Sequence, residues 1–246
     1  MNKGIIYYTD CRLNEPIMST VQKYIADSGL PIVSCSLNSP INFGQNYVIK
    51  NRTRGYVTML EQIIMALEHL NTDYVFFCEH DVLYHTSHFE FLPLRDDTYY
   101  YNTNVWQWRY PTDYAITYDN IISLSELCCN RQLALNHFRS RWKKIKELQL
   151  DLVHKTQPGW VKKWGYEPGV ARKDGTGFSK ENYELRKSVY PNIDIRHKFT
   201  LTGNKTYLKQ FIHIPRNWKE INLNQIPGWD LKKIFNLNEN RVYSCR

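Results

Sequence analysis

The segment Tyr74-Val-Phe-Phe-Cys-Glu-His-Asp81 carries the clearest structural signal in the chain. Its first five residues are all apolar, which is typical of a strand buried on both faces near the centre of a parallel sheet. Three polar residues follow at once, so we expect a strand over residues 74–78 that ends in this polar triplet. Ligands of open α/β sheets bind beyond the carboxyl ends of such strands. The segment therefore predicts a central strand with a binding site at Glu79-His80-Asp81.

The residues before this strand predict a βαβ unit and a further helix. Residues 4–10 and 31–36 are short apolar runs typical of buried strands, and residues 14–27 between them have helix start and stop signals. Apolar residues at helical spacing predict another helix over residues 55–70. The alternation favours an α/β fold with a mostly parallel central sheet flanked by helices. At 246 residues, without a repeat or a clear linker, the chain is expected to form one domain.

The residues after the central strand predict an elaborated second half. Strands are expected within residues 98–125, near 194–201 and near 210–214, and helices over 125–150, around 180–189 and near 231–235. The glycine-rich residues 153–180 resemble a long loop. Loops of that length in compact domains are usually functional or mobile.

The composition is that of an ordinary folded protein, with 42% hydrophobic and 23% charged residues. No apolar run is long enough for a transmembrane helix, and we see no secretory signal, so neither is expected. The cysteines include no CxxC pair, which argues against a structural zinc site. Cys35 and Cys78 lie in apolar runs and are expected to be buried. The expected compartment is the reducing cytoplasm.

The net charge of +8 is unevenly distributed along the chain. Residues 1–100 contain 7 Lys and Arg against 11 Asp and Glu, whereas residues 101–246 contain 25 against 13. An acidic first half and a basic second half favour different ligands for the two halves. The alternative is that the basic residues form a solvated surface.

The Glu79-His80-Asp81 triplet has the chemistry of a metal site. Hard divalent cations such as Mg²⁺ and Mn²⁺ prefer carboxylate oxygens, and they neutralise diphosphate groups. Acid-x-acid triplets also arise by chance, so the alternative is a solvated strand end. The position directly after five apolar residues favours the metal site.

Three neighbouring stretches carry a resemblance to a known family. Residues 54–62, the helix that follows them and residues 73–84 are similar to the nucleotide-sugar half of glycosyltransferases with the glycosyltransferase-A fold, in which a strand ends in an acidic metal-binding motif. The Glu-His-Asp form resembles a subgroup found in bacteria and their phages. The similarity covers residues 4–92 and departs from the family pattern at Glu79, where Asp is usual.

The resemblance implies a metal-dependent transfer of a sugar from a nucleotide-sugar, in the first instance a UDP-sugar, to a hydroxyl acceptor. It divides the chain into a nucleotide-sugar half, about residues 1–97, and an acceptor half, about residues 98–246. The implied nucleotide-sugar-binding residues are Thr9, Asp10, Ser36, Arg54, Gln62 and Glu79. Asp10 has the alternative role of a turn residue, and Arg54 that of a surface charge.

The resemblance also implies metal ligands. Asp81 is the firmer ligand and Glu79 the second, with His80 serving as spacing. The family often adds a late histidine, for which His213 and His197 are the candidates, each with a purely structural role as the alternative. Imidazole suits Mn²⁺ better than Mg²⁺.

An inverting transferase needs a general base, and the glycine-rich loop offers two candidates. Glu167 is favoured because aromatic residues surround it in the sequence, and Asp174 is the second candidate. The alternative for both is a turn carboxylate. A retaining enzyme needs neither as a base.

Basic and aromatic residues alternate in the region that is expected to meet the acceptor. Residues 131–173 contain 11 Lys and Arg against 3 Asp and Glu. The expected acceptor-binding residues are Trp160, Trp164, Lys162 and Lys163. Such a surface suits DNA with a hydroxymethylated pyrimidine, an anionic polysaccharide or a lipid-linked glycan. Three alternatives stay open: a solvated helix face, a non-catalytic nucleic-acid-binding protein, and a nucleotidyltransferase.

Overall fold

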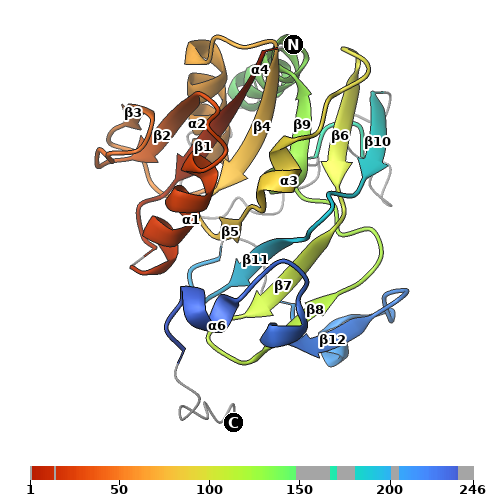
Figure 1. Ribbon diagram of the computed structural model, residues 1–246. Helices are drawn as coiled ribbons and strands as arrows, with labels where there is room; N and C mark the ends of the chain where they lie inside the picture. Colours follow the sequence, from red (N-terminus) through yellow and green to blue (C-terminus); the bar gives the residue numbers. More distant parts are fainter. Residues whose placement is uncertain (1, 14, 148–166, 171–180, 201–204, 238–246) are drawn as a thin grey trace.

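The computed structural model describes the chain except for residues 1, 14, 148–166, 171–180, 201–204 and 238–246 (Figure 1). The strands are β1 (Lys3–Thr9), β2 (Ile32–Leu37), β3 (Gln45–Ile49), β4 (Tyr74–Glu79), β5 (Val82–Leu83), β6 (Thr98–Asn102), β7 (Val105–Arg109), β8 (Tyr114–Thr117), β9 (Leu127–Asn130), β10 (Asn182–Arg186), β11 (Asn192–Arg196) and β12 (Lys219–Asn222). The α-helices are α1 (Ile17–Ala26), α2 (Tyr56–His69), α3 (Thr86–Phe89), α4 (Arg131–Glu147) and α6 (Leu231–Ile234), and short 3-10 turns are η1 (Leu124–Glu126), η2 (Leu208–Gln210) and η3 (Leu223–Gln225).

Seven strands form the larger sheet, in the order β10-β6-β9-β4-β1-β2-β3. The block β4-β1-β2-β3 is parallel, and β9 runs antiparallel to both of its neighbours. The apolar run at residues 75–78 is fully buried in β4, at the centre of the order, as its sequence predicts. The prediction of an α/β fold with a central sheet flanked by helices is confirmed.

Five further strands form a second sheet, in the order β12-β8-β7-β11-β5, which was not predicted from the sequence. Only the β11–β7 pair is parallel among its described pairs. The chain passes from β4 in the first sheet to β5 in the second through His80 and Asp81, so the acidic triplet lies where the two sheets meet (Figure 1).

The two faces of the larger sheet have separate cores because side chains alternate along each strand. Ile6 and Tyr8 of β1 belong to the core that includes apolar residues of α2 and α4. Ile5 and Tyr7 belong to the other core, which includes α1 and continues into the second sheet at Trp106 and Trp108. This second core fixes the small sheet against the large one, and thus fixes the junction between them.

Several sequence-based boundaries need correction. Residues 182–186 form strand β10 and not a helix, and the predicted strand at residues 210–214 is absent, with Ile212 and Ile214 exposed. Helix α4 begins at Arg131, because the preceding residues pair as β9 between β4 and β6. Strand β3 pairs with β2 in parallel and was not predicted from the sequence. None of the helices in the described ranges has the length and apolarity to span a bilayer.

Candidate functional site

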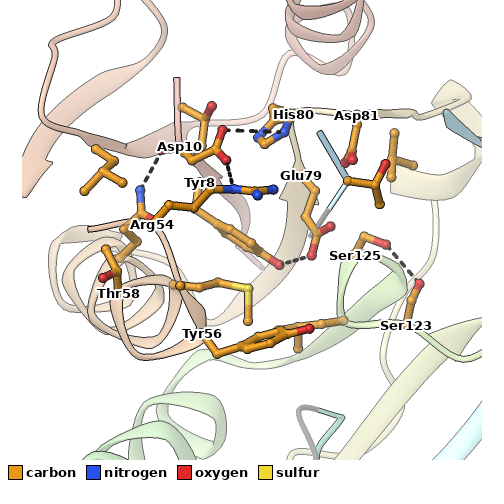
Figure 2. Close-up of a pocket in the computed structure, with 18 of the residues that line it drawn as sticks. Tyr8, Asp10, Arg54, Tyr56, Thr58, Glu79, His80, Asp81, Ser123 and Ser125 are labelled. Carbon is orange, nitrogen blue, oxygen red and sulfur yellow. Dashed lines mark hydrogen bonds and ion pairs between the residues drawn. The ribbon is translucent and has the colours of Figure 1, made fainter. Parts of the chain in front are cut away.

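A pocket of about 950 Å³, its open mouth included, lies at the carboxyl ends of β1 and β4 (Figure 2). Its lining residues come from both sheets, helix α2 and the residues before β9. They are Tyr8, Thr9, Asp10, Leu37, Arg54, Gly55, Tyr56, Thr58, Met59, Gln62, Glu79, His80, Asp81, Val82, Ser123, Leu124, Ser125, Glu167, Asp194, Arg196 and Thr200.

Three candidate metal ligands, His80, Asp81 and His197, cluster at the edge of this pocket, and His80 and Asp81 are part of its lining. Each offers one ligand atom, and these atoms lie within 4.8 Å of one another. His197 Nε2 lies 3.2 Å from Asp81 Oδ2. The antiparallel pairing of β5 with β11 brings them together, since it places Asp194 opposite Val82 and lets the amide of Ile195 donate to the Asp81 carbonyl at 2.8 Å. The structure therefore joins residues that are 116 positions apart.

The Asp81 carboxyl group of the cluster is held in its ionised form. Burial pushes the pKa of Asp81 upward, but nearby His80, His197 and the Arg196 guanidinium outweigh it and hold that pKa below its usual value. Within the described part of the chain, His80 Nδ1 is buried and has no hydrogen-bond partner. Two imidazole nitrogens and one carboxylate form a donor set that suits Mn²⁺ and related transition metals better than Mg²⁺, which prefers oxygen. The residues therefore fit a divalent metal.

Glu79 has a different environment from Asp81. The parallel register pairs it with Tyr8 of β1, whose hydroxyl donates to Glu79 Oε1 at 2.7 Å (Figure 2). Burial, reinforced by the charge of Asp81, raises the pKa of Glu79 to about 8. Glu79 is not one of the three clustered ligands, although it lines the pocket.

The predicted nucleotide-sugar residues fall into two groups. Thr9, Asp10, Arg54 and Gln62 line the pocket, and Arg54 forms an ion pair with Asp10 and donates to the Phe199 carbonyl. The Gln62 amide nitrogen is already used, because it donates to the carbonyls of Thr9 and Cys35 at 2.8 and 2.9 Å. Ser36 does not line the pocket, and its hydroxyl lies against the Asn46 side chain.

Part of the pocket lining is apolar. It includes Tyr56 and Met59 at the start of α2, Leu37 at the end of β2, and Leu124. Tyr56 is buried, with 6% of its surface exposed, so its ring is held in place by the core. A lining that combines apolar and charged side chains suits a ligand with a flat ring and an anionic group.

Several pocket residues were not foreseen from the sequence. His80 was assigned to spacing, yet it belongs to the ligand cluster. Asp194 and Arg196 form a buried ion pair on the wall that β11 contributes. Burial raises the pKa of Asp194 despite this partner. The Asp-Ile-Arg alternation in β11 is the signal that places both side chains on one face.

The remaining sequence candidates separate clearly. Glu167 lines the pocket. His213 is exposed and is not part of the metal cluster, so His197 is the late histidine that the structure places beside Asp81. Asp174 and the four expected acceptor residues, Trp160, Lys162, Lys163 and Trp164, lie outside the described residues.

No protein-family model matches the sequence, and no curated protein matches it. Among solved structures, a glycosyltransferase involved in the glycosylation of the major capsid of PBCV-1 has 12% identity and a TM-score of 0.42, over 76% of this chain and 82% of that one. The apo form of the glycosyltransferase GlyE of Streptococcus pneumoniae TIGR4 has 10% identity and a TM-score of 0.37, and this chain covers 39% of it with 61% of its own length. A second GlyE structure has a TM-score of 0.34 at 10% identity, over 63% of this chain and 44% of that one. Scores this low do not assign a family, so the function has to follow from the site.

Proposed function

We propose that this protein is a metal-dependent glycosyltransferase that moves a sugar from a nucleotide-sugar, in the first instance a UDP-sugar, to a hydroxyl acceptor. The observation that carries the proposal is the cluster of His80, Asp81 and His197, two of which line a pocket that also contains apolar side chains and the Asp10–Arg54 pair. A nucleotide-sugar needs these three features together, since it has a flat base, a diphosphate and a sugar.

Different residues of the pocket would bind the base, the ribose and the metal. Tyr56 and Met59 offer an apolar surface for the base, while Asp10 and Arg54 offer a carboxylate and a guanidinium to its polar groups or the ribose. His80, Asp81 and His197 would hold the metal. When bound, a divalent cation neutralises charge on the diphosphate and makes it a better leaving group.

The transfer breaks the acceptor O–H bond, joins that oxygen to the anomeric carbon, and breaks the bond from this carbon to the diphosphate. In an inverting transfer a general base takes the hydroxyl proton. We assign this role to Glu167, which lines the pocket and comes from the second half of the chain. Asp194 is the weaker candidate because it is committed to an ion pair with Arg196.

A thermal-shift screen of UDP-, GDP- and other nucleotide-sugars, with and without Mn²⁺, tests the donor half of the proposal. We expect one nucleotide class to raise Tm only when Mn²⁺ is present, and Asp81→Ala to lose this shift while keeping its circular dichroism. Full activity of Asp81→Ala would rule out the metal role.

An acceptor screen completes the test. DNA with hydroxymethylated pyrimidine, anionic polysaccharide and lipid-linked glycan are the three arms, because the basic second half of the chain suits each of them. If free sugar is released but none of the three acceptors is glycosylated, the activity would be hydrolysis of the donor and not transfer. Tight, salt-sensitive DNA binding that ignores Mn²⁺ and nucleotide-sugars would instead favour a non-catalytic nucleic-acid-binding protein.

A further inference from the structure

Residues 205–219, which we call the basic apolar loop, expose an unusual amount of apolar surface. Ile212 is 92% exposed and Ile214 76%, and the nearby Tyr207 and Leu208 are exposed by 37% and 39%. Single exposed apolar side chains are common, but four within eight residues form a patch, and such patches mark interaction sites.

The same loop is uniformly basic. It contains Lys205, Lys209, Arg216 and Lys219, all of them exposed, and no Asp or Glu. The acidic side chains next to it already have partners. Glu220 is paired with Arg109 through two hydrogen bonds of 2.9 and 2.6 Å, and Asp119 accepts from the Asn217 amide at 2.8 Å.

The loop has a defined base. The rings of Phe211 and Trp218 meet with centroids 5.5 Å apart, and Tyr118 of the neighbouring segment stacks on Trp218 at 6.0 Å. The Asp119 amide also donates to the Arg216 carbonyl at 3.0 Å. Residues 212–217 therefore extend from an aromatic base with both isoleucines exposed.

The loop is also fixed to the sheet that forms one wall of the pocket. Arg109 donates to the Thr206 carbonyl at 2.6 Å, and its guanidinium lies 4.2 Å from the centre of the Tyr207 ring. In the β7–β11 register, Arg109 is directly opposite Arg196, which lines the pocket. A surface bound by the loop would therefore be held in a set geometry relative to the pocket.

We propose that the basic apolar loop binds the surface of an anionic membrane. Ile212 and Ile214 enter the interfacial region, where their burial is favourable, and the surrounding Lys and Arg contact lipid phosphates. A nucleic acid or other polyanion in water explains the charge but gives the two isoleucines no apolar environment. The proposal concerns where the protein binds and does not depend on the reaction at the pocket.

Co-sedimentation of the full chain with lipid vesicles tests the proposal. We expect binding to vesicles of phosphatidylcholine mixed with phosphatidylglycerol, weaker binding at high salt, and little binding to phosphatidylcholine alone. The double variant Ile212→Asp/Ile214→Asp should lose at least about tenfold in vesicle affinity, as should Lys209→Glu/Arg216→Glu.

The matched control is Leu94→Asp/Val189→Asp, which makes the same change at side chains that are 87% and 75% exposed outside the loop. It should bind vesicles like the unmodified chain. Equal binding by the Ile212→Asp/Ile214→Asp variant and the unmodified chain would overturn the proposal, as would absence of binding to anionic vesicles. Binding to duplex DNA that is lost in Lys209→Glu/Arg216→Glu but kept in Ile212→Asp/Ile214→Asp, with no vesicle binding, would identify a polyanion site and overturn it too.

Discussion

Two buried clusters join the two sheets, and both combine a carboxyl group with histidine. The open cluster is His80, Asp81 and His197, of which His80 and Asp81 line the pocket. The sealed cluster consists of His88, Asn102, Glu126 and Asn192, and the side chains of His88 and Glu126 are fully buried. In the sealed cluster, Asn192 and Asn102 donate to Glu126 Oε2 at 2.7 and 3.1 Å.

The carboxyl groups of the two clusters differ in protonation. Neighbouring imidazoles and Arg196 hold the pKa of Asp81 below its usual value. Burial raises the pKa of Glu126 to about 8 and lowers that of His88 well below its usual range, so both side chains are neutral at pH 7. The difference teaches that a buried carboxyl group beside histidine is not by itself a metal site. An ionised carboxylate and an accessible pocket make the open cluster the candidate.

The largest expected effect is the loss of the open cluster's carboxylate. Asp81→Asn keeps the size of the side chain but weakens metal binding, so Mn²⁺-dependent transfer should fall by about a thousandfold. Rates with saturating donor, with and without EDTA, measure the loss. EDTA should inactivate the unmodified chain and have little further effect on the variant.

His213→Ala is the matched control for this prediction, because His213 is exposed and stands apart from the cluster. It should keep full activity, whereas His197→Ala should lose most of its Mn²⁺ affinity. Equal Mn²⁺ affinities for His197→Ala and His213→Ala would contradict the assignment of the open cluster.

For the sealed cluster we expect pH to affect the stability of the fold and not the activity. An unfolded Glu ionises near its ordinary pKa of about 4.3, whereas folded Glu126 keeps its proton up to about pH 8. Between these two values the unfolded chain binds fewer protons, so this residue lowers the free energy of unfolding as pH rises. The effect is flat below and above that window.

Glu126→Gln removes this titration and keeps the shape of the side chain. As pH rises from about 5.5 to 7.5, the free energy of unfolding of the unmodified chain should therefore fall by about 3 kcal/mol more than that of the variant. Urea unfolding at the two pH values measures it. The same pH dependence in both proteins would mean that Glu126 is already ionised in the folded state.

The sequence predicts the parts of the fold that depend on local patterns. Helix α2 and strand β4 were correctly placed because a helical apolar spacing and an uninterrupted apolar run are strong local signals. Strand β10 was mistaken for a helix, and the second sheet was missed. Strands were expected within residues 98–125 and near 194–201, where β7, β8 and β11 lie. Their assembly into a second sheet depends on pairing between distant segments, such as β5 with β11, which no local pattern reveals.

The site was predicted in the same uneven way. The resemblance implied Asp81 as the firmer metal ligand and Glu79 as the second, with His80 serving as spacing. After β4 the chain turns at His80 and Asp81, and these two neighbours belong to the ligand cluster, whereas Glu79 does not. The sequence could not show which of His197 and His213 lies near Asp81, because both stand in or next to a short stretch of alternating apolar residues. Only the pairing of β5 with β11 shows that it is His197.

A smaller effect is expected at the edge of the open cluster. Arg54 neutralises Asp10 and holds the Phe199 carbonyl, so Arg54→Ala should weaken nucleotide-sugar binding by about tenfold through a disordered pocket wall. Calorimetric titration measures the change. Arg52→Ala is the control, since Arg52 pairs with Glu61 with 48% of its side chain exposed, and such surface pairs contribute little. Equal losses in both variants would point to a general charge effect.

The smallest expected effect tests how Glu79 is held beside the open cluster. Tyr8→Phe removes the hydroxyl that donates to Glu79 Oε1 at 2.7 Å, and should lower the free energy of unfolding by about 1 kcal/mol because a buried polar atom loses its partner. Thermal unfolding at neutral pH measures the loss. Tyr47→Phe is matched to it, since the Tyr47 hydroxyl accepts from Gln45 at 2.6 Å near the surface, where water replaces the bond. A larger loss in Tyr47→Phe than in Tyr8→Phe would show that the Tyr8–Glu79 hydrogen bond does not stabilise this edge of the site.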